Sequence, residues 1–459
     1  MQKKFFLGRF ALLSTFMAVF LSQSSCVYYR PAPIEKVPFR QHLSTTTDDD
    51  IAVSAAVLSP EESRKIFDTD LYARGIQPVW LEIENKSSST LVFFERSVDP
   101  RYYSHMEAAH RSHIPVWSPF FEHGLFSVFM WPLLPLAPLR ALSASEANKD
   151  MDEYFDDAGI GNEALSPGER VEGFVFTPVD AGTKRVPVCL VGAGERHTCT
   201  LFLKVPGTVI DYDLVEFQSI YRHEDYVDHD WQSFMERLTA MSRFTTNARG
   251  TKQGDPVNLA IIGELDDVLQ AFAVAGWDET EPLTFSSSWR TARSYLKGQN
   301  YRTSPVSNLY LFGRRQDFAL QKARDTISAR NHLRLWHTPW RVEGKPVWVG
   351  QVSRDIGVRL TLKTWNLTTH RIDPDIDDAR DNVLGDLVET RRVSVVGFVA
   401  GGHKRTRETP GRNLTGDRYY TDGEILVLGI DDKETDLSVF DWHTRGFKKL
   451  PRAAVEVDP

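Results

Sequence analysis

Side chains that could carry acid–base or anion chemistry are concentrated between residues 331 and 381. Imidazole and carboxylate groups act together in general acid–base catalysis, and guanidinium groups stabilise anions. The stretch combines all three kinds of group: His332, Arg334, His337, Asp355, His370, Asp373, Asp375, Asp377, Arg380 and Asp381. Apolar runs lie between them, so the pattern favours a polar site on a small sheet over a merely charged surface.

A hydrolytic site is the first interpretation of this stretch. His332 or His370 would act as acid and base, because an imidazole titrates near neutral pH. Asp373 or Asp355 would orient the imidazole. Arginines would stabilise a bound anion. The candidate ligand-binding residues are Arg314, Arg334, Asp317 and Arg380.

Two other interpretations fit the same residues. A metal site would draw on carboxylate–imidazole mixtures, which suit zinc, manganese or iron. Its ligands would be His332, His370, Asp373 and Asp375. A structural network would instead use Arg–carboxylate pairs and loop-capping aspartates to lock the domain. The metal interpretation is not favoured, so no metal or other cofactor is predicted.

Strands and a helix must position these groups. Side chains alternate along a strand, so a strand at 332–336 would place His332 and Arg334 on one face, with His337 on the other. Further strands are predicted at 347–352 and 358–365. Apolar residues three and four apart predict a helix at 376–389. If the helix packs on the sheet, a His–Arg–Asp cluster forms at one edge.

Length and composition predict an α+β protein of more than one domain. At 459 residues the chain exceeds the size of one hydrophobic core. Strand-like runs bounded by Gly, Pro and Ser predict a β-sandwich-like domain at 51–206. A linker at 207–250 would lead to a mixed α+β domain at 251–430, with a small sheet and flanking helices. Residues 431–459 form a charged C-terminal tail.

Charge and motifs exclude several classes of function. The net charge is −8 and basic residues are scattered, which argues against a nucleic-acid partner. The sequence also lacks a Gly-x-Ser-x-Gly elbow, a His-Glu-x-x-His zinc motif and a phosphate-binding Gly-rich loop. Protein partners cannot be predicted from this pattern.

The N-terminus predicts export. A positive start and the apolar run 10–21 form a secretory signal peptide at 1–25. Cys26 follows small residues and resembles the lipid-bearing cysteine of bacterial lipoproteins, although Gln23 stands where that family usually has Leu. The resemblance implies a membrane anchor at Cys26, and Val27 implies an outer-membrane protein facing the periplasm. Ordinary cleavage, giving a soluble periplasmic or secreted protein, is the alternative. Residues 26–50 are predicted to be an extended tether.

An apolar insertion interrupts the first domain at 114–142. Pro132, Pro135 and Pro138 exclude a regular spanning helix. The insertion is expected to be buried as a cap on the sandwich. Contact of residues 117–139 with the bilayer beside the anchor is the alternative.

Two cysteines flank a turn signal in the same domain. Cys189 and Cys199 lie in apolar runs on either side of Gly194, which predicts a hairpin. In an oxidising compartment a disulfide could join them across the hairpin. Buried free thiols are the alternative, because the register of the two strands is not fixed by the sequence.

Residues 255–390 resemble the LssY-type C-terminal domain of bacterial envelope proteins. The matching words are Asp255-Pro-Val-Asn-Leu, Ala275-Gly-Trp277, Ser304-Pro-Val-Ser-Asn-Leu-Tyr-Leu-Phe-Gly-Arg314 with Asp317, His332-Leu-Arg-Leu-Trp336, Val347-Trp-Val-Gly350 with Asp355, and His370-Arg-Ile-Asp-Pro-Asp375 with Arg380-Asp381. The family has no settled activity. In some members the domain accompanies a phospholipid-phosphatase-type enzyme, which implies an envelope or phospholipid setting. This chain lacks that enzyme's catalytic signature, so phosphatase activity does not transfer.

These observations predict an exported, lipid-anchored cell-envelope protein with a binding or structural role and a polar His/Arg/Asp site. The alternative is an envelope hydrolase that acts on a phosphate- or carboxylate-bearing substrate, including one derived from phospholipid. The sequence leaves open whether the protein is an enzyme.

Overall fold

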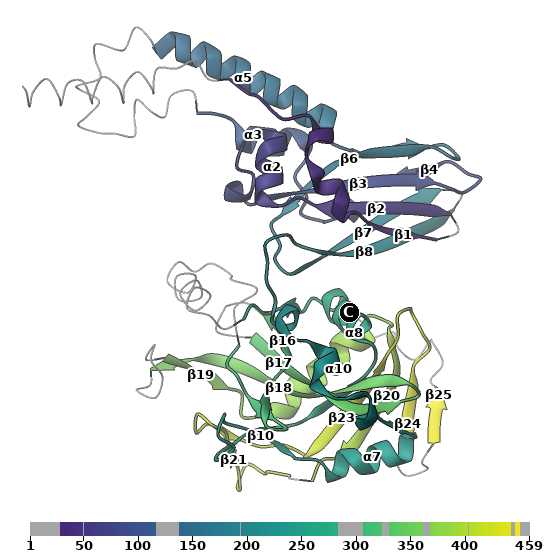
Figure 1. Cartoon of the computed structure of the whole chain (residues 1–459), viewed down its shortest axis with the longest axis vertical. Helices are drawn as coiled ribbons and strands as arrows, with labels where there is room; N and C mark the ends of the chain where they lie inside the picture. Colours follow the sequence, from purple (N-terminus) through teal and green to yellow (C-terminus); the bar gives the residue numbers. More distant parts are fainter. Residues whose placement is uncertain are drawn as a thin grey trace, which may run out of the picture. The chain divides into compact units, whose positions relative to one another are not determined.

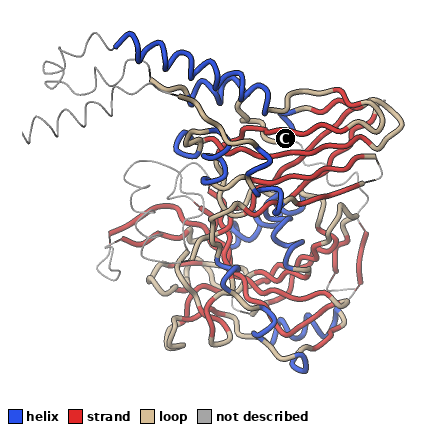
Figure 2. The backbone as a smooth tube through the Cα atoms, turned by 45° about the horizontal axis from the view of Figure 1, so that its top comes forward, coloured by secondary structure: helices blue, strands red, loops and turns tan. Residues whose placement is uncertain are grey.

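The structure is a computed structural model of the whole chain (Figure 1). It describes residues 28–48, 50–115, 137–192, 194–282, 306–323, 330–360, 368–402, 404–441 and 446–449. The chain divides into two compact units. The first comprises residues 1–180 and 184–207, and the second comprises residues 181–183 and 208–459. Figure 2 shows that strands are the main elements of both units. The predicted α+β class is confirmed.

Two four-stranded sheets form the sandwich of the first unit. One sheet has the order β1-β2-β3-β6: Ser44–Thr47, Ile51–Val57, Ile76–Asn85 and Arg170–Pro178. The other has the order β5-β4-β7-β8: Ala164–Leu165, Leu91–Phe93, Thr183–Gly192 and Glu195–Lys204. Alternate residues of the strands, such as Val53 and Ala55 of β2 and Val186 and Val188 of β7, pack in one apolar core. This alternation is what a sheet with one buried face requires.

Helices and the N-terminal segment cover the other face of the β1-β2-β3-β6 sheet. The α-helices of this unit are α2, α3 and α5: Pro60–Phe67, His105–Ser112 and Ala137–Ala158. Its 3-10 helices are η1, η2, η3 and η4: Ile34–Lys36, Pro38–His42, Tyr72–Arg74 and Glu95–Ser97. Phe67, Phe155 and Phe174 form an aromatic core with Phe39 of η2.

The predicted tether at 26–50 is therefore wrong for its described part. Phe39 is fully buried, and β1 pairs with β2 from Ser44↔Ala55 to Thr47↔Ala52. The segment is polar overall, so its composition does not reveal that its few apolar residues pack in a core.

Several N-terminal predictions fall outside the described residues. These are the signal peptide at 1–25, the anchor at Cys26, and residues 116–136 of the apolar insertion, for which burial was expected and bilayer contact was the alternative. Within the described residues, the model contains no helix with the length and apolar character needed to span a membrane.

The two cysteines do not form the predicted disulfide. The hairpin of β7 and β8 exists, with Gly194 at φ +81°, but both cysteines are buried free thiols. Cys199 faces the sandwich core, whereas Cys189 lies between the core residues Val188 and Leu190 and so faces the other side of the sheet. The Sγ of Cys189 accepts a hydrogen bond from Nε of Arg196 at 3.0 Å. A disulfide cannot join side chains on opposite faces of a sheet.

An eleven-stranded mixed sheet organises the second unit. Its main path is β13-β16-β17-β18-β12-β23-β20-β24-β25: Asp278–Glu279, Phe318–Ala323, Arg330–Val342, Lys345–Leu360, Leu259–Ile262, Glu424–Ile430, Val393–Ala400, Ser438–Asp441 and Gly446–Lys449. Beside this path, β19 (Thr368–Ile372) pairs with β18, and β9 (Val227–His229) pairs with β17. The sheet is larger than expected because β9, β24 and β25 come from segments predicted to be a linker and a tail.

Smaller elements complete this unit. A second sheet has the order β11-β10-β14-β15: Gln253–Pro256, Phe244–Thr246, Tyr310–Leu311 and Arg314–Arg315. β21 (Gly411–Arg412) pairs with β22 (Arg418–Tyr419). The helical elements are α6, α7, α8, α10, η6 and η7: Phe217–Ile220, Trp231–Ala240, Leu265–Val274, Ile376–Val388, Asp211–Leu214 and His223–Asp225.

Each face of the large sheet has its own apolar core. On one face, Leu333 and Leu335 of β17 pack with Phe272 of α8 and Val383 of α10. On the other, Trp336 of β17 packs with Phe234 of α7. The opposite orientation of neighbouring residues along β17 thus assigns each helix to a face.

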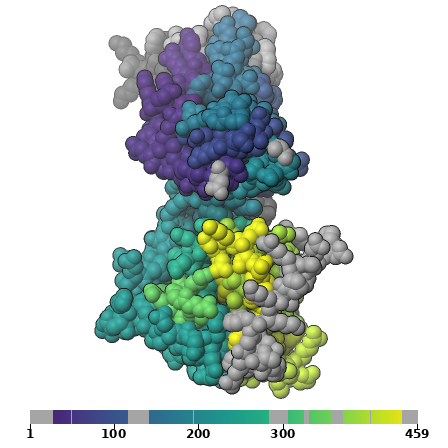
Figure 3. Space-filling view, turned by 90° about the vertical axis from the view of Figure 1, so that its right-hand side faces the viewer, coloured from purple at the N-terminus to yellow at the C-terminus, as the bar shows by residue number. Residues whose placement is uncertain are grey.

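Two predicted boundaries are corrected by this packing. Phe234 and Met235, within the predicted linker 207–250, are fully buried. Phe440, within the predicted tail 431–459, is 7% exposed and belongs to the same core. The last described residues, bright yellow in Figure 3, lie on the surface of this unit. Both segments are integral to the second unit.

Candidate functional site

The strands β16, β17 and β18 bring polar side chains to one face of the large sheet. Their register places His332 opposite Gln321 on one side and opposite Ser353 on the other. Arg334 lies opposite Gln351, two residues along the same face. Beyond Arg334 this face becomes apolar at Trp336. We call the polar end of this surface the polar face and define it as Asp255, Gln321, Arg330, His332, Arg334, Gln351, Ser353 and Asp355.

His332 and Asp355 form an imidazole–carboxylate pair on the polar face. Nε2 of His332 lies 2.8 Å from Oδ2 of Asp355. The two side chains are 12% and 8% exposed. A carboxylate in this position fixes the orientation of the imidazole, which is what a general acid or base requires. The structure therefore brings together two of the four candidate catalytic residues.

Arg334 is buried beside Asp255. Its Nε donates to the carbonyl oxygen of Ser307 at 2.9 Å, and its Nη1 donates to Oε1 of Gln351 at 2.8 Å. Burial lowers the pKa of Arg334, and the charges of Asp255 and Asp355 only partly oppose it. Burial likewise raises the pKa of Asp255, against the attraction of Arg334. Among the described residues, Oδ1 of Asp255 has no hydrogen-bond partner.

Arg330 extends the same arrangement toward the start of β17. Its Nη1 donates to Oε1 of Gln321 at 2.8 Å. Burial lowers the pKa of Arg330, while Asp278 and Asp355 raise it. The polar face thus holds two buried guanidinium groups and two carboxylates around one imidazole. Burying charged groups of this kind has a large desolvation cost in free energy. The set is stable only when the attraction and hydrogen bonds among its members offset that cost.

Arg314 and Asp317 form a separate network near the middle of β17, at His337. Their side chains make an ion pair. Oδ2 of Asp317 accepts a hydrogen bond from the amide of His337 at 2.6 Å, and Nη2 of Arg314 donates to the His337 carbonyl oxygen at 2.5 Å. Burial raises the pKa of Asp317, and Arg314 opposes the rise. This pair holds the backbone of β17 and makes no contact with His332 that would build a shared site.

His337 faces away from the polar face, as the alternation predicted. Its ring lies 4.7 Å from that of Trp348 and 5.8 Å from that of Tyr226, measured between centroids. Burial, together with Arg314 and Arg341, lowers the pKa of His337 to about 4. The imidazole is therefore neutral at physiological pH and serves as part of an aromatic cluster.

Arg380 holds the start of α10 to the loop before β23. Its Nη1 and Nη2 donate to the two carboxylate oxygens of Asp422 at 2.8 and 2.9 Å, and its Nε donates to Asp381 at 3.0 Å. Asp377 accepts hydrogen bonds from the Thr421 hydroxyl and the Asp422 amide, each at 2.7 Å. Arg380 is thus engaged in a structural clamp rather than in the polar face.

Asp373 contacts the opposite side of β18 from Asp355. Its Oδ2 lies 3.9 Å from Nη1 of Arg354, which also makes an ion pair with Asp378. Arg354 precedes Asp355 in the strand, so their side chains point to opposite faces. Asp373 therefore cannot share the orienting role with Asp355.

Comparison with protein families adds one finding. Residues 219–425 match the family described as LssY C-terminus. The second unit carries an LssY-type C-terminal domain. The match begins within α6, before the predicted boundary at 251, and so agrees with the inclusion of α7 in this unit. No curated protein is significantly similar to the chain.

His370 lies far along β18 from His332 in the LssY-type domain. It pairs with Val358, whereas His332 pairs with Ser353, five residues earlier. At about 3.3 Å per residue this is roughly 16 Å along the strand. The side chain of His370 lies outside the described residues. The backbone thus separates the two candidate histidines.

The proposed metal set is not assembled. His332 and Asp373 contact opposite faces of the sheet, through Asp355 and Arg354 respectively, and the backbone of His370 is distant along β18. In the described part of the chain, no group of three or more His, Cys, Asp or Glu side chains is arranged to hold a metal ion.

Sequence reasoning missed part of the polar face of the LssY-type domain. Arg330, Gln321 and Gln351 are all buried. A signal for them was present, because polar residues at every second position interrupt otherwise apolar strands. Asp255 lies in a separate small sheet, and its approach to Arg334 depends on tertiary packing that strand patterns do not encode.

Proposed function

We propose that the protein is a lipid-anchored component of the bacterial cell envelope, and that its LssY-type domain has a binding or structural role. The signal-like N-terminus and Cys26 support the envelope location. The family match supports an LssY-type domain of unsettled activity.

The contacts that the charged side chains make with distant segments support the structural part of this proposal. Each described arginine among the candidates links its own segment to another part of the domain. Arg334 reaches Ser307, 27 positions away, and Arg380 reaches Asp422, 42 positions away. Buried guanidinium groups that are already paired hold a fold in place. The rigid surface that results is suited to binding.

A hydrolase is the second candidate, and one observation favours it. Asp355 orients His332 at 2.8 Å, which is the geometry of a general base. Buried Arg334 lies two residues along the same strand face and would stabilise an anionic substrate or transition state.

Hydrolysis assays separate the two candidates. The purified mature protein is tested against phosphate monoesters, phosphate diesters and carboxylic esters, together with His332→Ala and Arg391→Met. Arg391 is an exposed control, with a side chain that is 71% accessible. The structural proposal predicts no turnover in any sample and a lower melting temperature for His332→Ala. Wild-type turnover that Arg391→Met keeps and a folded His332→Ala loses would establish the hydrolase instead.

The anchor is tested independently by Cys26→Ser. The wild-type protein should fractionate with membranes and carry a lipid mass at its N-terminus, whereas Cys26→Ser should be exported and remain soluble. Membrane association of the variant equal to that of the wild type would refute lipid anchoring at Cys26.

A further inference from the structure

The N-terminal segment, residues 28–43, is folded against helix α2 of the first unit. At the C-terminal end of α2, the Arg30 amide donates a hydrogen bond to Oδ2 of Asp68 at 2.8 Å. The Ala32 amide donates to the carbonyl oxygen of Lys65 at 2.9 Å. These two bonds fix the path of the chain within a few residues of the start of the described structure.

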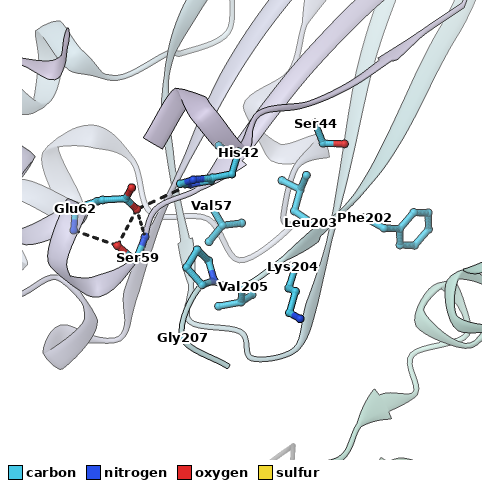
Figure 4. Close-up of a pocket in the computed structure, with 12 residues that line it drawn as sticks. His42, Ser44, Val57, Ser59, Glu62, Phe202, Leu203, Lys204, Val205 and Gly207 are labelled. Carbon is cyan, nitrogen blue, oxygen red and sulfur yellow. Dashed lines mark hydrogen bonds and ion pairs between the residues drawn. The ribbon is translucent and has the colours of Figure 1, made fainter. Parts of the chain in front are cut away.

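The same segment also reaches the start of α2. The carboxylate of Glu62 accepts hydrogen bonds from the Ser59 amide at 2.8 Å and from the Ser59 hydroxyl at 2.7 Å, so a capping box holds the first turn of the helix. His42 lies beside this box in Figure 4, with its Nε2 3.9 Å from the Glu62 carboxylate. The N-terminal segment therefore runs along α2 from one end of the helix to the other.

Tyr29 connects the N-terminal segment to α5. Its ring lies 5.9 Å from that of Tyr154 in an edge-on arrangement, measured between centroids. Tyr29 packs on the buried cluster that contains Phe67 and Phe155, and Ile76, the first residue of β3, belongs to the same cluster. Packing of a large aromatic side chain stabilises the contact. The fold of the first unit thus sets the position of residue 29.

The proposed anchor is very close to this fixed point. Val27 is the one residue between Cys26 and Tyr28. Each residue of an extended chain adds at most about 3.6 Å, so the Cα atoms of Cys26 and Tyr28 are at most about 7 Å apart. A flexible spacer of about twenty residues would instead span roughly 25 Å. A lipid on Cys26 would therefore hold the C-terminal end of α2 at the bilayer.

The exposed side chains at this end of α2 suit a membrane–water interface. Tyr28 is 64% exposed, and the guanidinium of Arg30 lies 4.9 Å from the centre of its ring. Tyrosine is enriched at bilayer interfaces, and arginine can keep its charge among the headgroups while its stem covers apolar surface. Lys65 is 56% exposed and pairs with Glu61, so the anchor and the aromatic ring matter here more than excess charge. We call Tyr28, Arg30 and Lys65 the proximal surface.

We propose that the proximal surface lies directly on the lipid bilayer, with Tyr28 and Arg30 among the headgroups. The inference rests on the proposed lipid at Cys26 and adds the orientation in which that lipid holds the first unit. Strand β3 leads away from this end. It begins at Ile76, in the cluster on which Tyr29 packs, and its 10 residues span roughly 30 Å. The turn after β3, which contains Ser88, is therefore far from the proximal surface.

Quenching of a site-specific fluorophore tests this orientation. Arg30→Cys and Ser88→Cys are prepared in the lipidated, full mature chain and labelled with an iodoacetamide derivative of nitrobenzoxadiazole. Both positions are exposed, and the parent protein, in which Cys189 and Cys199 are buried, gives the background labelling. The proteins are placed in phosphatidylethanolamine–phosphatidylglycerol vesicles with or without a lipid that carries a spin label on its headgroup. We expect the spin label to quench position 30 at least twofold more than position 88.

A spacer variant separates orientation from lipidation. About twenty Gly and Ser residues are inserted between Val27 and Tyr28, which gives the first unit roughly 25 Å of reach from the anchor. This variant should keep its lipid mass and its membrane fractionation, while position 30 should be quenched no more than position 88. The matched control carries the same spacer at Ser88, far from the proximal surface, and should keep the strong quenching at position 30.

Mass spectrometry of the N-terminus distinguishes failure of this inference from failure of the proposed anchor. Equal quenching at positions 30 and 88 in a lipidated protein would overturn the orientation and leave the anchor standing. Quenching at position 30 that the spacer after Val27 does not reduce would do the same. A protein without the lipid mass would overturn both the anchor and the orientation.

Discussion

Two arginine–aspartate pairs in the LssY-type domain occupy contrasting surroundings. Arg380 binds Asp422 through two parallel hydrogen bonds, and the Asp422 side chain remains 39% exposed. Arg334 and Asp255 are both 8% exposed, and in the described structure Oδ1 of Asp255 accepts no hydrogen bond. The first pair is hydrogen-bonded at a half-open edge, whereas Arg334 and Asp255 are enclosed and interact through their charges rather than through a direct hydrogen bond.

The pKa values of the two pairs respond in opposite directions. Burial acts to lower the pKa of Arg380, but the hydrogen bonds and charges of Asp422 and Asp381 raise it overall. Burial would raise the pKa of Asp422, yet Arg380 and the Glu424 amide bring it below its ordinary value. For Arg334 and Asp255, burial outweighs attraction. Opposite charge alone therefore does not set the pKa values; the extent of burial and the hydrogen bonds between the partners also contribute.

The largest expected effect comes from breaking the enclosed pair. Arg334→Met should lower the free energy of unfolding by about 3–5 kcal/mol, because Asp255 is left as a buried carboxylate without the guanidinium whose charge opposes its burial. Urea unfolding measures the change. The exposed control Arg391→Met should change stability by less than about 0.5 kcal/mol. A loss below about 1 kcal/mol for Arg334→Met would contradict this prediction, because it would be the size expected for a charge on the protein surface.

A smaller effect is expected at the hydrogen-bonded pair. Arg380→Lys should cost about 1.5–3 kcal/mol, since a lysine keeps the charge but cannot make two parallel hydrogen bonds to Asp422. The same urea unfolding experiment applies. If Arg380→Lys destabilised the protein more than Arg334→Met, the contrast between the two pairs would be reversed.

The pH dependence of stability should differ in sign between the two aspartates. The raised pKa of Asp255 means that its contribution is fully present below about pH 4 and is lost as the pH rises through the folded-state value. The lowered pKa of Asp422 means that its contribution is present above about pH 4 and is lost as the pH falls. Urea midpoints between pH 3 and pH 7 test this. Asp255→Asn should flatten the upper part of the profile and Asp422→Asn the lower part; the reverse assignment would contradict both directions.

The smallest effect is expected for the imidazole of the polar face. His332→Gln should cost about 0.5–1.5 kcal/mol, because one hydrogen bond to Asp355 is lost or lengthened while a polar side chain remains. Thermal unfolding at pH 7 measures it. A loss comparable to that of Arg334→Met would show that His332, rather than Arg334, is the residue on which the polar face depends.

Local patterns were enough to predict part of the site. The alternation along β17 correctly placed His332 and Arg334 on one face, and Asp355 was among the carboxylates expected to orient the imidazole. Both follow from the period of two in a strand. Strand alternation also explains why the side chains of Cys189 and Cys199 lie on opposite faces of their sheet. Predicting this would have required the register of the hairpin, which the sequence left open.

Long-range packing accounts for what the sequence did not predict. β18 runs for 16 residues, so β19 returns beside its far end and carries His370 away from His332. Phe39 and Phe440 belong to largely polar segments, and only the tertiary structure shows that their side chains are buried in apolar cores. Composition alone therefore predicted a tether and a tail where the chain is packed.

A double-mutant cycle between Arg334 and Asp255 tests the central claim most directly. The claim is that the buried charges of the polar face are mutually dependent structural groups. Arg334→Met and Asp255→Leu should each destabilise the protein strongly, and the double variant should recover at least about 2 kcal/mol of the summed loss in urea unfolding. Purely additive losses would contradict the claim.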